Sequence, residues 1–395
     1  MADVTFKAFA GINNKLRAER LQAGDLVSAM NVNVSDDGQL ARRDGRELKL
    51  AASAHSLWSD GTICLFVDGT TLKRLNEDYT ATTLVELTSG EPMAYVSINN
   101  RVYYGNGTDK GIISETGTRR TWGLVPPGLP LASNAGGVLP AGTYQFAMTY
   151  VREDGQESGA GLAGRIDVTT GGIEFSDIPV SADSTVTHKI LYVTPQNGDV
   201  LYRAAILRED VVGYTYTGGP LSIPLNTQYM QDPPAGEIVA YHFGHLYVIV
   251  GSIVYYSQPY GYELFDLRDF LAFDGPVRIF APIDSGIWVG TDKEISWLAG
   301  TDPRKMEKAD RAVTKSVKGT LAYIQRESLP EIKEGVPDTK VALWWTGEGV
   351  CAGYPSGVLH KLTESRYRPS IDGISGAGLV AQTTGGDQYI AVIKS

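Results

Sequence analysis

The sequence has few cysteines, few charged side chains and no long hydrophobic run. Its two cysteines, Cys64 and Cys351, lie far apart, which excludes a disulfide framework and a cysteine-based metal cluster. Both lie in strand-like runs, so we expect buried, reduced thiols, as in proteins assembled in a reducing cytoplasm. Every apolar stretch is interrupted within a few residues, and the first residues lack a charged leader followed by an apolar run. We therefore expect a soluble protein made in the cytoplasm.

Charged residues make up 20% of the chain, against about a quarter in an average protein. This scarcity disfavours a helix-rich protein, whose exposed faces need Glu and Lys. Glycine (45) and tyrosine (21) are instead abundant, which is typical of many short strands joined by tight turns. The net charge of −10 argues against a DNA-coating protein, which needs a basic face. A surface along which DNA slides stays compatible with it.

The motifs of common catalytic and ligand sites are missing. We find no nucleophile elbow, no glycine-rich loop that leads into a helix, and no calcium-binding loop. Among the five histidines, His242 and His245 lie three residues apart in a strand-and-turn segment, where we expect them to point to opposite faces. The sequence therefore predicts a non-enzymatic protein with no catalytic residue, metal or cofactor.

Hairpin patterns recur from about residue 55 onward, every 35 to 45 residues. Two of them are alike: Glu-Pro-Met-Ala-Tyr at 91–95 leads to Arg-Val-Tyr, and Glu-Ile-Val-Ala-Tyr at 237–241 leads to His-Leu-Tyr. Repeats of this length are typical of propeller blades. We expect an all-β fold, a β-propeller of about five or six blades that occupies residues 55–134 and 235–395.

Residues 1–54 are predicted to form an N-terminal arm that contributes a hairpin to the propeller. Residues 29–34 alternate between apolar and polar, a turn ending in Asp-Gly follows, and residues 39–42 form a second short run.

Residues 138–231 contain about seven short strands in some ninety residues, which predicts an inserted β-sandwich of immunoglobulin or fibronectin type. Proline-rich runs at 125–130 and 232–236 flank this segment as linkers.

The N-terminal string resembles the opening of tail hub, nozzle or packaged-DNA-stabilising proteins of short-tailed bacteriophages. The resemblance lies in Phe-Ala-Gly-Ile-Asn-Asn at 9–14, Ala-Met-Asn-Val-Asn-Val at 29–34 and Gly-Gln-Leu-Ala-Arg-Arg-Asp-Gly at 38–45. A second echo runs through residues 280–300, from Phe-Ala-Pro-Ile-Asp to Trp-Leu-Ala-Gly. The resemblance covers the propeller-like parts, about three quarters of the chain.

This resemblance implies a virion protein assembled in the host cytoplasm as a ring, commonly of six copies. Such a ring lies below the portal and adaptor proteins, forms a conduit or gate for genomic DNA, and docks spike, fibre or needle proteins. A head-to-tail ring needs two different contact patches on each subunit.

Two basic groups are candidate contacts with DNA or a neighbouring subunit. One comprises Arg42, Arg43 and Arg46, and the other comprises Arg304, Lys305 and Lys308. A solvated loop explains the second group equally simply, because acidic residues are interleaved with it. A tyrosine-rich run from Tyr255 to Phe265 is read either as a subunit joint or as blade packing.

Two other functions stay open. A receptor- or glycan-binding propeller at a phage tail tip would carry one aromatic pocket per blade, whereas the six tryptophans do not recur in that way. A propeller hydrolase would need a central cluster of acids or a metal.

Overall fold

The computed structural model describes residues 8–395 apart from positions 36, 44, 46, 326, 328, 330–339, 371, 384 and 385. Strands dominate this part of the chain, and its one named helix is a single 3-10 turn, η1 (Ala18–Arg20). Of the residues described, none forms a helix long and apolar enough to cross a membrane.

Five sheets of four antiparallel strands form the larger part of the molecule, each pairing its strands in chain order. Their strands are β3 (Ala54–Ser59), β4 (Cys64–Asp68), β5 (Thr71–Leu75) and β6 (Ala81–Glu86); β7 (Ala94–Ile98), β8 (Arg101–Gly105), β9 (Lys110–Ser114) and β10 (Arg119–Arg120); β18 (Ile238–His242), β19 (His245–Val250), β20 (Ile253–Gln258) and β21 (Gly261–Ala272); β22 (Val277–Ile283), β23 (Gly286–Thr291), β24 (Ile295–Ala299) and β25 (Glu307–Ala312); β26 (Ala322–Gln325), β27 (Lys340–Thr346), β28 (Gly349–Gly353) and β29 (Leu359–Lys361). A sixth sheet holds two strands, β30 (Ser375–Thr383) and β31 (Gly386–Lys394).

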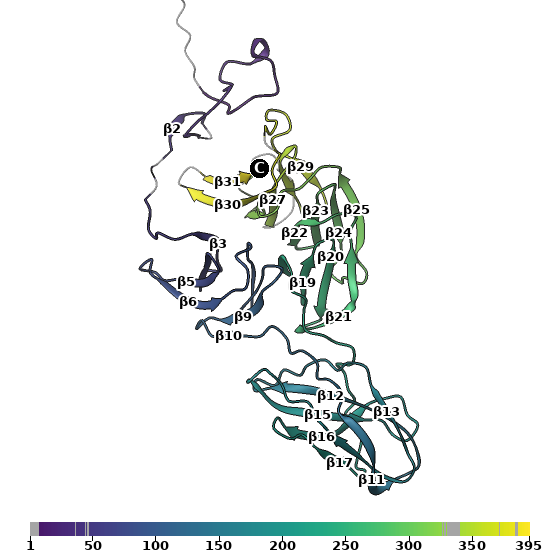
Figure 1. Cartoon of the computed structure of the whole chain (residues 1–395). Coiled ribbons are helices and arrows are strands. Elements are labelled where there is room, and N and C mark those ends of the chain that lie inside the picture. The colour runs from purple at the N-terminus through teal and green to yellow at the C-terminus, as the bar shows by residue number, and fades with distance from the viewer. Residues whose placement is uncertain are drawn as a thin grey trace, which may run out of the picture.

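The sheets follow one another as blades (Figure 1). Apolar cores shared between blades pack each one on the next. Val67 of the first blade packs with Tyr104 of the second, and Val289 of the fourth packs with Tyr256 of the third. The first strands β7, β18 and β22 of successive blades also contact one another. The prediction of an all-β propeller with five or six blades is confirmed: five blades are complete and the sixth is a hairpin.

The turn chemistry explains why these segments fold as tight hairpins. Asn99 and Asn100, between β7 and β8, both have positive φ (49° and 63°), the conformation of a two-residue hairpin turn that asparagine tolerates. The two similar sequence units identified above are β7–β8 and β18–β19, the first two strands of neighbouring blades. Repeated sequence therefore marks repeated position in the propeller.

The N-terminal arm carries the predicted hairpin, β1 (Val32–Val34) paired with β2 (Leu40–Arg42). Among the described residues these two strands pair only with each other. The contribution to the propeller that we expected from residues 1–54 is therefore not made by strand pairing within the chain.

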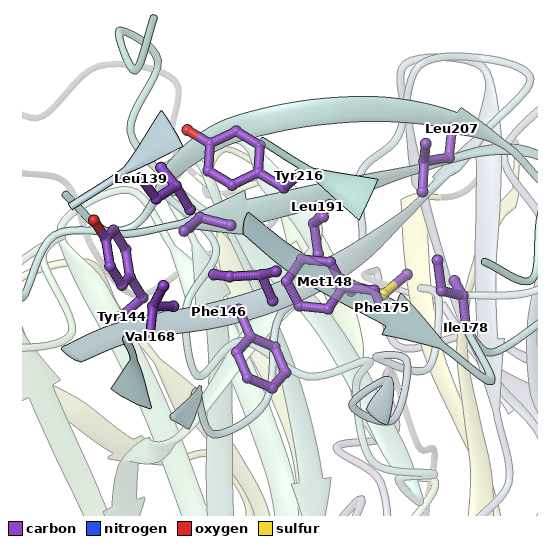
Figure 2. Packing of buried hydrophobic residues seen from close by; sticks show 12 residues of the cluster. Leu139, Tyr144, Phe146, Met148, Val168, Phe175, Ile178, Leu191, Leu207 and Tyr216 are labelled. Carbon is purple, nitrogen blue, oxygen red and sulfur yellow. The ribbon is translucent and has the colours of Figure 1, made fainter. Parts of the chain in front are cut away.

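Between β10 and β18 two antiparallel sheets pack face to face. One is β11 (Leu131–Leu139), β14 (Gly171–Ser176) and β17 (Tyr214–Tyr216); the other is β13 (Gly164–Val168), β12 (Gly142–Arg152), β15 (Val186–Val193) and β16 (Tyr202–Arg208). Figure 2 shows the core between them, in which the Phe146 and Phe175 rings meet edge to face at 5.1 Å. The first strand begins at Leu131, seven residues before the expected boundary at 138. An immunoglobulin or fibronectin type stays a prediction.

Candidate interaction surfaces

The predicted basic residues lie in two separate places. Arg42 is the last residue of β2 and Arg43 follows it, both exposed on the arm, while Arg46 lies outside the described residues. Arg304 and Lys305 lie in the turn between β24 and β25, and Lys308 lies on β25. The arm and β25 are on opposite sides of the propeller (Figure 1). The structure therefore does not bring the two groups together.

The basic residues of the second group all have carboxylate partners. Arg304 pairs with Asp269, Lys305 with Asp302 at 3.3 Å, and Lys308 with Glu294 at 2.6 Å. The hydrogen bond to Glu294 is the main reason that the pKa of Lys308 is raised. These ion pairs reduce the positive charge that the turn offers to DNA. That the three basic residues contact DNA or a neighbouring subunit stays a prediction.

A buried charged cluster joins the propeller to the two-sheet unit. The guanidinium of Arg152, at the end of β12, is fully shielded from solvent and donates to Glu263 of β21 at 2.8 Å. It also donates to Asp154 at 2.9 and 3.1 Å and to the carbonyl oxygen of Thr121 at 3.3 Å. Glu263 accepts a further bond from the backbone N–H of Gly123 at 3.0 Å. A single buried arginine therefore ties together the inserted unit, the first linker and the third blade.

The rim of this cluster is ionic as well. Arg120 donates to Asp154 at 2.8 Å and to Glu153 at 3.0 Å, while Arg101 lies 3.6 Å from Asp154. Thr121 donates to Asp183 at 2.7 Å. These contacts come from the second blade, its exit linker and the inserted unit. Asp232 of the second linker pairs with Lys110 of the second blade, so neither linker acts as a free tether.

This cluster was not predicted from the sequence. The alternation of β12 could have revealed it. Every second residue of this strand faces the core, namely Tyr144, Phe146, Met148 and Tyr150, and Arg152 is the next in the series. A charged residue at a core-facing position of a strand predicts a buried partner.

Acid should loosen this junction through Asp154. Burial by itself would raise the pKa of Asp154, but hydrogen bonds from Arg152 and the positive charges nearby outweigh it, so the pKa is lowered. A carboxylate whose folded-state pKa is depressed stabilises the fold above its unfolded pKa of about 4, and that contribution is lost as pH falls through the folded value. We expect Asp154→Asn to be less stable than the wild type at pH 7, with the gap closing below about pH 4. Urea unfolding of both proteins from pH 7 to 3 measures this; a gap independent of pH would contradict it.

An exposed aromatic surface lies at one end of the third blade. Phe243, in the β18–β19 turn, is 56% exposed, and Tyr260, in the β20–β21 turn, is 78% exposed. Both have positive φ (41° and 58°), which is unusual for bulky residues and marks local strain. The backbone N–H of Tyr260 donates to the carbonyl oxygen of Gly244 at 2.7 Å, which fixes the two turns to each other.

The tyrosine-rich run from Tyr255 to Phe265, predicted to be either a subunit joint or part of the blade packing, contains both buried and exposed rings. Tyr256 and Phe265 are buried in blade packing, whereas Tyr260 faces solvent. Tyr262 lies between them and meets Tyr241 edge to face at 6.0 Å.

Gly244 is needed for this arrangement, because its φ is +83° and an added Cβ would lie 3.1 Å from the Tyr260 ring. We expect Gly244→Ala to lower the free energy of unfolding by about 1–3 kcal/mol. The matched control is Gly251→Ala, where φ is also positive (+60°) but no atom lies within 4 Å of the added Cβ. Thermal unfolding of both variants separates the effect of the contact with the Tyr260 ring from that of the positive φ. Equal losses of stability in the two variants would show that this contact does not contribute.

The histidine prediction was wrong in its geometry. The two-residue turn makes His242 and His245 direct cross-strand partners, which places their side chains on the same face of the blade. Burial lowers the pKa of His242. Within the described part of the chain no group of three or more His, Cys, Asp or Glu residues is placed to hold a metal.

The first blade carries a shallow hollow of about 600 Å³. Its lining includes Arg74, Glu77 and Asp78, beside Cys64. Asp78 is already engaged by the Thr80 hydroxyl at 2.6 Å, and burial raises the pKa of the Cys64 thiol. The hollow therefore does not offer an activated nucleophile.

No known family model and no curated protein matches the chain. Solved structures with a similar fold include BBS1N in complex with ARL6DN (12% identity over 86% of this chain and 91% of that chain, TM-score 0.33). Another is a streptogramin B lyase (9% identity over 87% of this chain and 94% of that chain, TM-score 0.33). A third is the N-terminal domain of Nup159 (11% identity over 86% of this chain and 73% of that chain, TM-score 0.34). Likeness at this level carries no argument about activity or partners. The chain is an all-β propeller protein, as the pairing of its own strands shows.

Proposed function

We propose that this chain is a non-enzymatic, ring-forming structural subunit of a phage tail. In this function it forms a hub or nozzle below the portal and adaptor proteins, provides a conduit or gate for DNA, and carries spike, fibre or needle proteins. The proposal begins from the resemblance of the N-terminal string to tail hub proteins.

The observation that carries the proposal is the exposed N-terminal arm. Met30 is 86% exposed, Val27 69% and Leu48 78%, and Met30 lies within one of the strings that carry the resemblance. Apolar side chains gathered on a projecting segment mark a surface that another molecule covers. In a ring, that molecule is the neighbouring subunit.

The rigid attachment of the inserted unit suits a mechanical role. The buried Arg152–Glu263 pair and the anchored linkers hold it on the second and third blades. A platform that docks distal tail parts has to transmit force without swinging.

Light scattering of the purified protein, alone and with its candidate adaptor ring, tests the proposal. We expect a closed ring, most informatively a six-fold ring that forms on the adaptor. A protein that stays monomeric in both conditions would overturn the ring role.

The alternative is a receptor- or glycan-binding propeller at a phage tail tip, and two observations favour it: the hollow on the first blade and the exposed aromatic surface of Phe243 and Tyr260. Aromatic faces are common in carbohydrate and protein recognition. Binding of bacterial envelope sugars by the monomer, lost in Tyr260→Ala, would move this function to first place.

A further inference from the structure

The sixth blade is incomplete, and this sets it apart from the other five. Each of the other blades has four strands, whereas β30 and β31 form a two-stranded sheet. On its other side β30 makes one isolated parallel bridge, between Ser375 and Lys318, and among the described residues β31 has no second partner strand. Val380 and Tyr389 of this hairpin pack on the fifth blade. Where the chain is described, no apolar core joins the hairpin to the first blade.

The sequence of β31 is that of an interior strand. Between Asp387 and Lys394 it reads Gln-Tyr-Ile-Ala-Val-Ile, with no charge, proline or glycine. The charges of β31 are confined to its ends, whereas the fourth strands β21 and β25 carry charges within their length, as β25 does with Lys308, Asp310 and Arg311. Natural edge strands are protected by such charges, and an uncharged apolar edge is a template for another strand. β31 is therefore built to be paired on both sides.

The N-terminal arm supplies a hairpin of matching character. β1 is Val-Asn-Val, alternating and uncharged, while β2 is Leu-Ala-Arg and is followed by Arg43. Two strands from the arm and two from the sixth blade make four, the number found in every other blade. The order β30–β31–β1–β2 would bury the uncharged strand and leave the basic strand at the edge.

Within its own chain the arm is held at its base and left uncovered beyond it. Asp25 pairs with Arg366, and Asn14 exchanges hydrogen bonds with the backbone of Arg368 at 2.8 and 2.7 Å. Beyond this clamp Met30 and Leu40 are exposed, and on the unfinished sheet Leu379 and Val392 are 53% and 66% exposed. A second copy can cover both sets of side chains in one contact.

We propose that the β1–β2 hairpin of one copy adds to the β31 edge of a second copy and completes its sixth blade. This is strand addition, in which main-chain hydrogen bonds join the partners and alternate side chains set the register. Donor and acceptor surfaces differ, so the contact is head to tail and can close a ring. The inference rests on the proposed function for the presence of a second copy and names the contact that the ring uses.

Cross-linking between two single-cysteine variants tests it, in a Cys64→Ser background because Cys351 is buried. One protein carries Asn33→Cys on β1 and is labelled with ¹⁵N; the other carries Ala391→Cys on β31 and is unlabelled. The two are mixed, assembled alone and with the adaptor ring, and treated with a short bismaleimide. We expect a covalent dimer whose linked peptide carries one labelled and one unlabelled half.

The matched control replaces Ala391→Cys by Thr83→Cys, an exposed position on β6, the outer strand of a complete blade. We expect no link there. A ring of the right mass without the 33–391 link would overturn this inference and leave the ring proposal standing. A monomer in every condition would overturn both. A link formed only inside single copies of the Asn33→Cys, Ala391→Cys double variant would show that the hairpin completes its own blade, which also contradicts the proposal.

Discussion

Arg152→Ala is expected to lower the free energy of unfolding by about 3–5 kcal/mol. The substitution removes the hydrogen-bonded cation from Glu263, a carboxylate that is 4% exposed, and leaves only the more distant Arg101, at 3.8 Å, to balance the buried charge. Asp154 loses two hydrogen bonds in the same step. Breaking one side of a buried ion pair costs more than the pair itself contributes, because the remaining charge stays out of water. Urea unfolding at pH 7 measures the loss.

Two further variants show whether the stranded carboxylate is the cause. Arg152→Ala combined with Glu263→Gln should recover part of the stability, since a neutral amide can still accept the Gly123 N–H bond. Arg165→Ala removes an exposed arginine of β13 that lies 3.7 Å from Asp167, and we expect a change within about 0.5 kcal/mol. Equal losses in Arg152→Ala and Arg165→Ala would mean that the buried cluster does not hold the junction.

Trp288→Ala is expected to cost about 3–5 kcal/mol, the range for deleting a large buried aromatic side chain. Trp288 on β23 is fully buried, 5.0 Å from the Trp297 ring and 6.0 Å from that of Trp344 on the fifth blade. Its indole N–H donates to the carbonyl oxygen of Tyr354 at 3.1 Å. The substitution therefore opens a cavity between the fourth and fifth blades and removes the hydrogen bond that joins β23 to Tyr354.

The control for this prediction is Trp345→Ala, one residue along the chain from Trp344. Trp345 is half-buried and contacts Tyr367 at 6.0 Å, so we expect a smaller loss. Thermal unfolding of both variants compares the two sites. A larger loss for Trp345 than for Trp288 would show that the inter-blade core is not the main source of stability here.

The local features of the chain were readable from its sequence. Hairpins were predicted around the Asp-Gly turn of residues 29–42 and in the unit that begins at residue 91, and β1–β2 and β7–β8 form there. Alternation and turn residues act over a few positions, so a single segment carries the whole signal. Because the hairpin units recur at the length of a propeller blade, the sequence also predicted the propeller.

The candidate sites were less predictable, because they depend on which segments meet. Arg304, Lys305 and Lys308 form a basic run in the sequence, but their partners Asp269 and Glu294 lie 35 and 14 residues from Arg304 and Lys308, respectively. The tyrosine-rich run likewise mixes buried and exposed rings, since a turn at Tyr260 reverses the chain within it. Neighbours in space, not in sequence, decide the charge and exposure of such groups.

The sequence by itself determined an all-β chain of hairpins, its repeat length and the position of the segment between the second and third blades. These follow from strand periodicity and turn chemistry, which each hairpin contains within itself. The tertiary structure alone decided that Arg152 meets Glu263 across 111 residues and that β31, apolar between Asp387 and Lys394, has one edge without a partner strand among the described residues. Both depend on contacts between distant segments, which no single hairpin contains within itself.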